Sequence, residues 1–219
     1  MNHNSLDFNH LLDEFNTTFN IKKPGDTVKL INDEYEEMLA EKPCTANHLK
    51  ELIDIIYVTS QQMRALGIDV NLEVTASYYD DSSNDLDIEI EHLVKTGGCI
   101  YLPDIIVSVI RLCESLNYNW QSAFLEVHRS NLSKRVPREQ AEKELEIARF
   151  RYPNAFIVEL QEYCLLKCAD TNKVIKPTCY SEAVMKEEWY SRNVKYSIQN
   201  MAKWIITASA IGLLISLII

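Results

Sequence analysis

Two pairs of acidic residues constrain this chain more than any other feature. Glu34 and Glu37 are three residues apart, and so are Glu51 and Asp54, which follow after a gap of thirteen residues. Residues at this spacing share one face of a helix. Two such helices packed together would bring four carboxylates to one place, which is unfavourable unless a cation neutralises them. Oxygen ligands of this kind suit Mg²⁺ or Mn²⁺. The alternative is that these side chains are solvated surface.

Apolar residues recur with a helical period in three N-terminal segments, over residues 6–19, 27–40 and 45–66. The acidic pairs border the apolar stripes of the second and third segments rather than opposing them. The short gap between the pairs favours an antiparallel pair of helices. The low numbers of glycine and proline, 5 and 6, also favour helices over a turn-rich β fold.

A possible internal repeat follows these segments. Asp54-Ile-Ile returns as Asp104-Ile-Ile fifty positions later, with Tyr101 in the place of Glu51, and both copies are predicted to be helical. Chance recurrence in an apolar helix is the alternative explanation. The polar stretch from Ser77 to Asp87 is typical of a surface loop or an insertion.

The remaining segments differ in character. We expect a helix over residues 120–134 and a charged, solvated helix over 138–151, separated by a break at Val136-Pro137. Alternating apolar residues over 155–176 predict a β-hairpin around Ala169-Asp-Thr-Asn172. A final polar helix or linker is expected over 182–203.

Composition limits the classes of function. The chain has 219 residues, 47% of them hydrophobic, and a net charge of −10, which disfavours binding to nucleic acid. The polar N-terminus does not resemble a signal peptide, so we expect a cytoplasmic protein whose six cysteines are reduced.

Cys164, Cys168 and Cys179 have irregular spacing and lack a fourth ligand, which disfavours zinc. No Walker A or Gly-x-Gly-x-x-Gly motif is present.

The sixteen residues from Trp204 to Ile219 carry no charge. As a helix they would span about 24 Å, against a hydrocarbon core of about 30 Å. Met201 and Ala202 would add length, and Trp204 would lie at the interface. We therefore expect a transmembrane tail anchor, with the preceding basic residues and the rest of the chain on the cytoplasmic side. A terminal helix buried in the core or in an oligomer is the alternative.

The acidic motif at this spacing resembles that of the all-α nucleotide pyrophosphohydrolases, the MazG-like and phosphoribosyl-ATP pyrophosphohydrolase-like family. The segment Ala123-Phe-Leu-Glu-Val-His-Arg-Ser-Asn-Leu-Ser-Lys134 closely resembles the one that follows the metal helices in that family. Asn172-Lys-Val-Ile-Lys-Pro-Thr-Cys-Tyr180 is similar to its lysine-proline tail. The three elements occur in family order and together cover about half of the chain.

The resemblance implies a dimeric helical protein that hydrolyses a nucleoside triphosphate, or a related nucleotide, to the monophosphate and pyrophosphate. Mg²⁺, or Mn²⁺, would be held by the two acidic pairs, with Glu34 and Glu37 also catalytic. Such an ion activates the attacking water and neutralises the phosphates. Contacts to the substrate are expected from His128, Arg129, Asn131, Lys134 and Lys176, although His128 and Arg129 could equally be surface polarity.

Two departures from the family pattern leave alternatives open. An insertion over about 70–102 separates the acidic helix from the His128 segment, so Asp104 could be the operative carboxylate in place of the Glu51 and Asp54 pair. A catalytically inactive, membrane-tethered nucleotide-binding or interaction protein is the alternative function. The expected organisation is a pyrophosphohydrolase-like domain (1–135), a charged helix with hairpin and tail (136–185), a linker helix (186–203) and a transmembrane tail (204–219).

Overall fold

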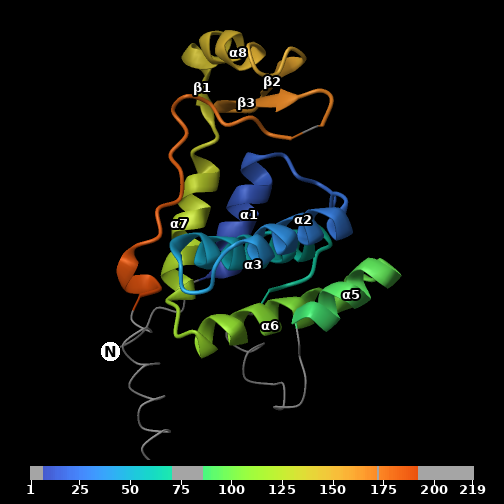
Figure 1. Cartoon of the computed structure of the whole chain (residues 1–219). Helices are drawn as coiled ribbons and strands as arrows, with labels where there is room; N and C mark the ends of the chain where they lie inside the picture. Colours follow the sequence, from blue (N-terminus) through green and yellow to red (C-terminus); the bar gives the residue numbers. More distant parts are fainter. Residues whose placement is uncertain (1–6, 71–85, 172, 192–219) are drawn as a thin grey trace, which may run out of the picture.

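The computed structural model describes residues 7–70, 86–171 and 173–191, and it shows a mostly helical protein with one small sheet (Figure 1). This confirms the predicted helical class with a small β element. The predicted C-terminal hydrophobic helix, and the predicted linker helix from position 192 onwards, lie outside the described residues. No helix in the described ranges has the length and apolarity needed to cross a membrane. The α-helices are α1 (Phe8–Thr18), α2 (Thr27–Ala40), α3 (Ala46–Ala65), α5 (Leu86–Thr96), α6 (Leu102–Ser115), α7 (Trp120–Leu132) and α8 (Ala141–Arg149).

Side-chain caps fix where the two acidic helices begin. The Asp26 carboxylate accepts the Lys29 N–H at 3.1 Å, and the Thr45 hydroxyl accepts the His48 N–H at 3.2 Å. Each cap satisfies a backbone donor that has no partner within its helix. After α3 the chain turns at Gly67, whose φ of 78° favours glycine.

The helix α3 lies at the centre of the helical part and packs against α1, α2, α6 and α7. Leu49, Leu52, Ile53 and Ile56 are fully buried there. The Oε1 atom of Gln62, near the end of α3, accepts bonds at 3.0 Å from the Gly25 N–H and the Thr27 hydroxyl at the start of α2. The start of α2 therefore lies beside the end of α3, which is the predicted antiparallel pair.

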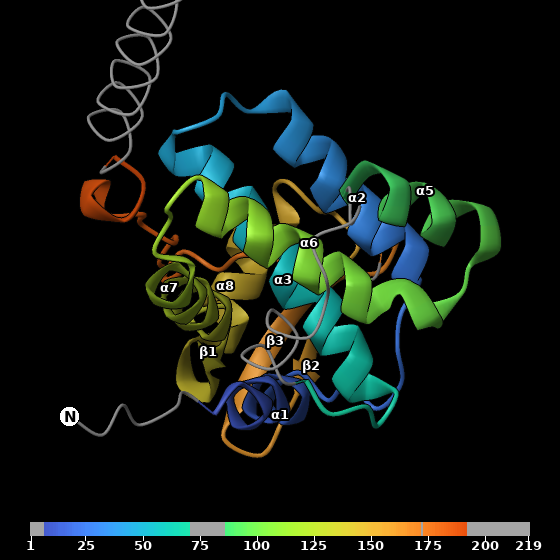
Figure 2. The same ribbon diagram turned by 90° about the horizontal axis from the view of Figure 1, so that it is seen from below.

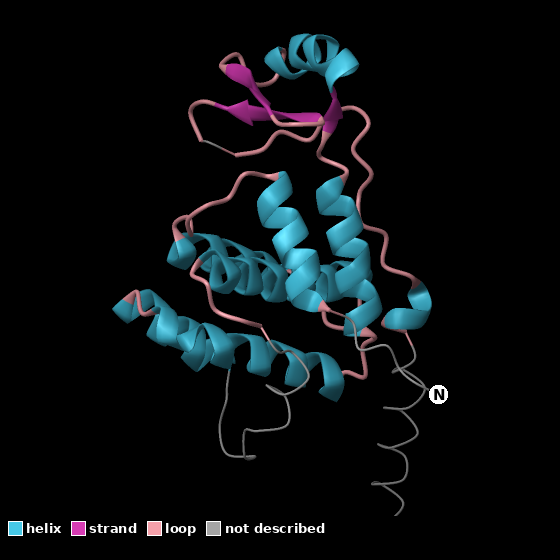
Figure 3. Cartoon of the chain, turned by 180° about the vertical axis from the view of Figure 1, so that it is seen from behind, coloured by secondary structure: helices cyan, strands magenta, loops and turns pink. Residues whose placement is uncertain are grey.

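A second, smaller unit lies beyond the end of α7 (Figure 1). Strands β1 (Val136–Pro137), β2 (Ala155–Glu159) and β3 (Tyr163–Cys168) form an antiparallel sheet in the order β1-β3-β2. The helix α8 packs on this sheet and closes a separate hydrophobic cluster. Seen from behind, the sheet and α8 stand apart from the helical layers (Figure 3).

Several predicted boundaries in this unit were wrong. The main hairpin turn lies at residues 160–162, and the segment around Ala169 only adds one bridge, between Lys167 and Val174. The strand β3 lies in the middle of the sheet, and four of its six residues are buried. The predicted break at Val136-Pro137 is confirmed, since α7 ends at Leu132 and α8 begins at Ala141, and the break itself forms the short strand β1. The charged helix is not wholly solvated, since it buries Ala141, Glu144, Leu145 and Ala148.

The insertion contributes the helix α5, which packs against α2 and α6. Asp87, predicted to end a loop, lies in the first turn of this helix; the loop itself falls mostly outside the described residues. The repeat is helical in both copies, and its two helices, α3 and α6, pack against each other. Between 182 and 191 only the short turn η3 (Glu187–Trp189) is helical, and Met185 and Trp189 join the helical core.

Candidate metal centre

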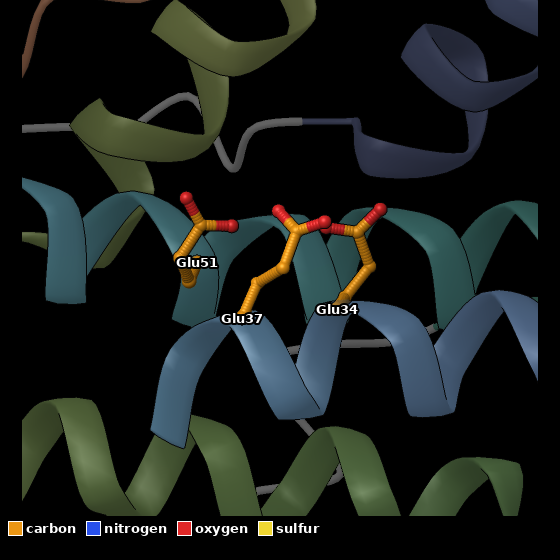
Figure 4. A group of neighbouring side chains, drawn as sticks. All are labelled: Glu34, Glu37 and Glu51. Atoms are coloured by element: carbon orange, nitrogen blue, oxygen red, sulfur yellow. The ribbon is translucent and has the colours of Figure 1, made fainter. Parts of the chain in front are cut away.

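Three carboxylates from neighbouring helices meet at one point. Glu34 and Glu37 lie one turn apart on α2, and Glu51 faces them from α3 (Figure 4). One oxygen from each lies within 4.8 Å of one oxygen of each of the others. Within the described residues, this is the one group of three or more acidic, cysteine or histidine side chains whose ligand atoms converge in this way.

The fourth predicted ligand, Asp54, is close by but has a different partner. Its Oδ2 atom lies 2.7 Å from the ammonium of Lys50, which also lies 2.9 Å from Oε1 of Glu51. Asp54 still lies near enough to affect Glu34, whose pKa is raised first by burial and then by the charge of Asp54. The structure therefore brings three of the four predicted ligands together and pairs the fourth with a lysine.

The carboxylates destabilise one another in the absence of a cation. Burial, followed by repulsion from Asp54, Glu37 and Glu51, raises the pKa of Glu34 to about 7. Burial also raises the pKa of Glu51, and Lys50 opposes this shift. The Oε2 atom of Glu51 is buried and has no hydrogen-bond partner. An unpaired buried carboxylate oxygen beside two further carboxylates fits a hard divalent cation, which would bind all three groups.

Of the two lysines that were predicted to bind substrate, Lys134 lies near the carboxylates and Lys176 lies near Lys134. Burial lowers the pKa of Lys134, and the nearby charges of Asp54 and Glu34 oppose that shift. Its ammonium donates to Oδ1 of Asn131 at 2.6 Å. Lys176 is exposed and lies 4.7 Å from the centre of the Tyr180 ring. Lys134 is near enough to Lys176 to be affected by its charge.

His128 and Arg129 have other partners. His128 is buried between Tyr57, whose hydroxyl lies 3.0 Å from Nδ1, and Glu14, whose carboxylate lies 3.3 Å from Nε2. Burial lowers the pKa of this histidine. Arg129 bonds to Glu126 and to the backbone oxygen of Glu182. These contacts join helices and hold the C-terminal segment. The hydrogen bonds of His128 and Arg129 therefore do not involve Glu34, Glu37 or Glu51.

Asp104, the alternative carboxylate, is not part of the cluster. It lies in the first turn of α6, where its charge raises the pKa of Glu89 on α5, although burial is the larger cause of that shift. The helix α6 packs on α3, and a view from below shows it with α5 on one side of the helical part (Figure 2). All six cysteines are free thiols, and Cys164 and Cys168 are buried in the sheet unit.

One residue of this cluster, Lys50, was not predicted from the sequence. Lys50 precedes Glu51 and lies four residues before Asp54, which is the spacing of a helical ion pair. That spacing could have identified it as the partner of Asp54. Comparison of this chain with protein-family models, with curated proteins and with solved structures finds no match in any of the three.

Proposed function

We propose that this protein is a Mg²⁺-dependent nucleotide pyrophosphohydrolase, which cleaves a nucleoside triphosphate or a related nucleotide to the monophosphate and pyrophosphate. The observation that carries the proposal is the convergence of Glu34, Glu37 and Glu51, with one Glu51 oxygen buried and unpaired. The likeness of the sequence motifs to those of the all-α nucleotide pyrophosphohydrolases supplies the reaction type. Mn²⁺ would suit the same oxygen ligands.

The residues of the centre have distinct roles in this proposal. The three glutamates would hold the divalent cation, which would supply a Lewis acid for the phosphoryl oxygens and lower the pKa of a bound water. A carboxylate oxygen of Glu34 or Glu37 orients the water and accepts its proton. Lys134, held by Asn131, and Lys176 contact phosphate oxygens as point charges.

Burial of Lys134 favours this role. Burial lowers the pKa of its ammonium because it removes water around the charge, and the same loss of water strengthens the attraction between the ammonium and a nearby phosphate. His128 and Arg129 act indirectly in this proposal. They hold the helix α7 and the C-terminal segment in place, and α7 leads directly into Lys134.

The test is pyrophosphate release from a panel of nucleoside triphosphates with Mg²⁺. Glu37→Gln removes one ligand charge and should lower turnover by about 100-fold or more, the range that proton-transfer and charge-stabilising groups contribute. Glu36→Gln is the matched control, because Glu36 lies on the same helix, is exposed and accepts a bond from Asn32. Wild-type protein that binds nucleotide and never releases pyrophosphate would overturn the proposal in favour of a catalytically inactive binding protein.

A further inference from the structure

The ammonium of Lys50 lies inside the acidic centre. Its Nζ atom is 2.9 Å from Oε1 of Glu51 and 2.7 Å from Oδ2 of Asp54. Only 26% of the Lys50 side chain is exposed, and its two partners are more buried, at 10% and 19%. We propose that Lys50 takes the place of a second cation, so that this centre binds one divalent ion per chain, at Glu34, Glu37 and Glu51. The inference rests on the proposed metal site.

The geometry makes Lys50 and a second ion mutually exclusive. An ion shared by Glu51 and Asp54 would lie about 2.0–2.2 Å from one oxygen of each. The ammonium already lies between the same two oxygens. The ammonium and a metal ion cannot occupy this position together. The ammonium is kept close to it because Lys50 belongs to α3, the helix that also carries Glu51 and Asp54.

The two oxygens of Glu51 have different surroundings. Oε1 is paired with Lys50, which also holds Asp54. Oε2 is buried without a hydrogen-bond partner, and one oxygen of Glu51 lies within 4.8 Å of an oxygen of Glu34 and of Glu37. Lys50 therefore neutralises Glu51 Oε1 and Asp54, and a divalent ion would neutralise the remaining charge of the three glutamates.

The balance of charge agrees with a single ion. One divalent ion and one ammonium leave the four carboxylates with one net negative charge, which lies close to the half-buried ammonium of Lys134. A second divalent ion beside Lys50 would add positive charge where no further carboxylate of the group lies. A divalent ion and the Lys50 ammonium, both bound to Glu51 and Asp54, would repel each other strongly in a partly buried site.

The experiment is a Mn²⁺ titration of the 219-residue chain in a mild detergent, followed by electron paramagnetic resonance to count bound ions. Wild type should bind one Mn²⁺ per chain. Lys50→Met frees Glu51 Oε1 and Asp54, so it should bind two. Lys50→Arg keeps the charge and should bind one. Lys29→Met is the matched control, because Lys29 forms a similar 2.9 Å ion pair with Asp33 on the surface of α2.

The outcomes separate this inference from the proposed function. Two ions in wild type, or one ion in Lys50→Met, would overturn the role of Lys50 and leave the three-glutamate site standing. No Mn²⁺ in wild type would overturn both the metal site and the role of Lys50. Lys50→Gln is a second neutral variant, expected to bind two ions, in case Lys50→Met does not fold. The number of Mn²⁺ ions bound per wild-type chain tests by itself whether the centre holds a single ion, without any variant.

Discussion

The two oxygens of Glu51 lie in different surroundings, so Lys50 relieves only part of the repulsion among the carboxylates of the proposed centre. Oε1 is paired with Lys50, whereas Oε2 is buried and unpaired. Burial alone would lower the pKa of Lys50, but the carboxylates of Asp54 and Glu51 raise it overall, so the lysine stays charged. A divalent ion in the proposed site would offset the cost of leaving the buried oxygen of Glu51 unpaired.

His128 gives a pH-dependent stability that is independent of the metal centre. Burial lowers its pKa below the usual 6.5 despite the bond to Glu14, so the folded protein holds a neutral imidazole. As the pH falls below about 6.5, the unfolded chain binds a proton that the folded chain resists. The stabilisation by His128 is therefore complete above that pH and is lost as the pH falls through the lower, folded-state pKa.

We predict that the difference in free energy of unfolding between wild type and His128→Gln narrows as the pH falls from 7.5 to 5. Urea denaturation at a series of pH values measures it. His92→Gln is the control, because His92 is exposed on α5. A difference that stays constant over this range would show that His128 does not contribute to the pH dependence.

Sequence spacing was sufficient to predict which face of each helix carries the carboxylates, but not the partner of every side chain. Glu34, Glu37 and Glu51 converge because their helices pack with the acidic faces together. Asp54 is paired with Lys50 through a local helical spacing that competes with metal binding. The burial of His128 was not predictable, because its partner Glu14 lies 114 residues away in the chain.

At the scale of single elements, α8 couples the sheet unit to the segment that carries Lys176. Glu144 on α8 is buried and accepts bonds from the backbone N–H of Thr178, at 2.7 Å, and from its hydroxyl. Thr178 lies two residues after Lys176. The carboxylate therefore fixes the path of the chain that brings this lysine near Lys134.

Glu144→Ala should lower the free energy of unfolding by about 1–3 kcal/mol, because it removes two hydrogen bonds from Thr178 to a buried carboxylate. It should also weaken nucleotide binding, since Lys176 would no longer be held in place. Thermal unfolding and a nucleotide titration measure the two effects. Glu142→Ala changes an exposed residue of the same helix and should have neither effect. Equal stability of the two variants would contradict this role of Glu144.

Helices were easier to predict than strands in this chain. The bounds of α2 were predicted as observed, because a regular apolar stripe and the Asp26 cap both mark them. The turn between β2 and β3 was misplaced, since the apolar run through both strands gives little local indication of where it reverses. All three strands also contact α8, and a local sequence pattern does not contain such contacts.

At the scale of the whole molecule, the described chain has two hydrophobic clusters. One lies among the helices around α3, and the other lies between α8 and the sheet. The proposed centre uses residues from the first part and Lys176 from the segment that leaves the second. A homodimer, which the family resemblance implies, stays a prediction that sedimentation of the purified protein would check.

Membrane anchoring by residues 204–219 also stays a prediction, because this segment lies outside the described residues. If the uncharged segment spans a bilayer, the 219-residue chain should remain with membranes after carbonate extraction. A variant that ends at Lys203 should be released by the same treatment. Extraction of the full chain by carbonate would contradict a transmembrane tail.

The most direct test of the proposed centre is a crystal structure grown with Mn²⁺ and measured at a wavelength where Mn²⁺ scatters anomalously. The account predicts an anomalous peak about 2.0–2.2 Å from one oxygen each of Glu34, Glu37 and Glu51, absent from a Glu34→Gln crystal. Saturating Mn²⁺ with no peak between α2 and α3, or with the three carboxylates turned apart into solvent, would contradict it.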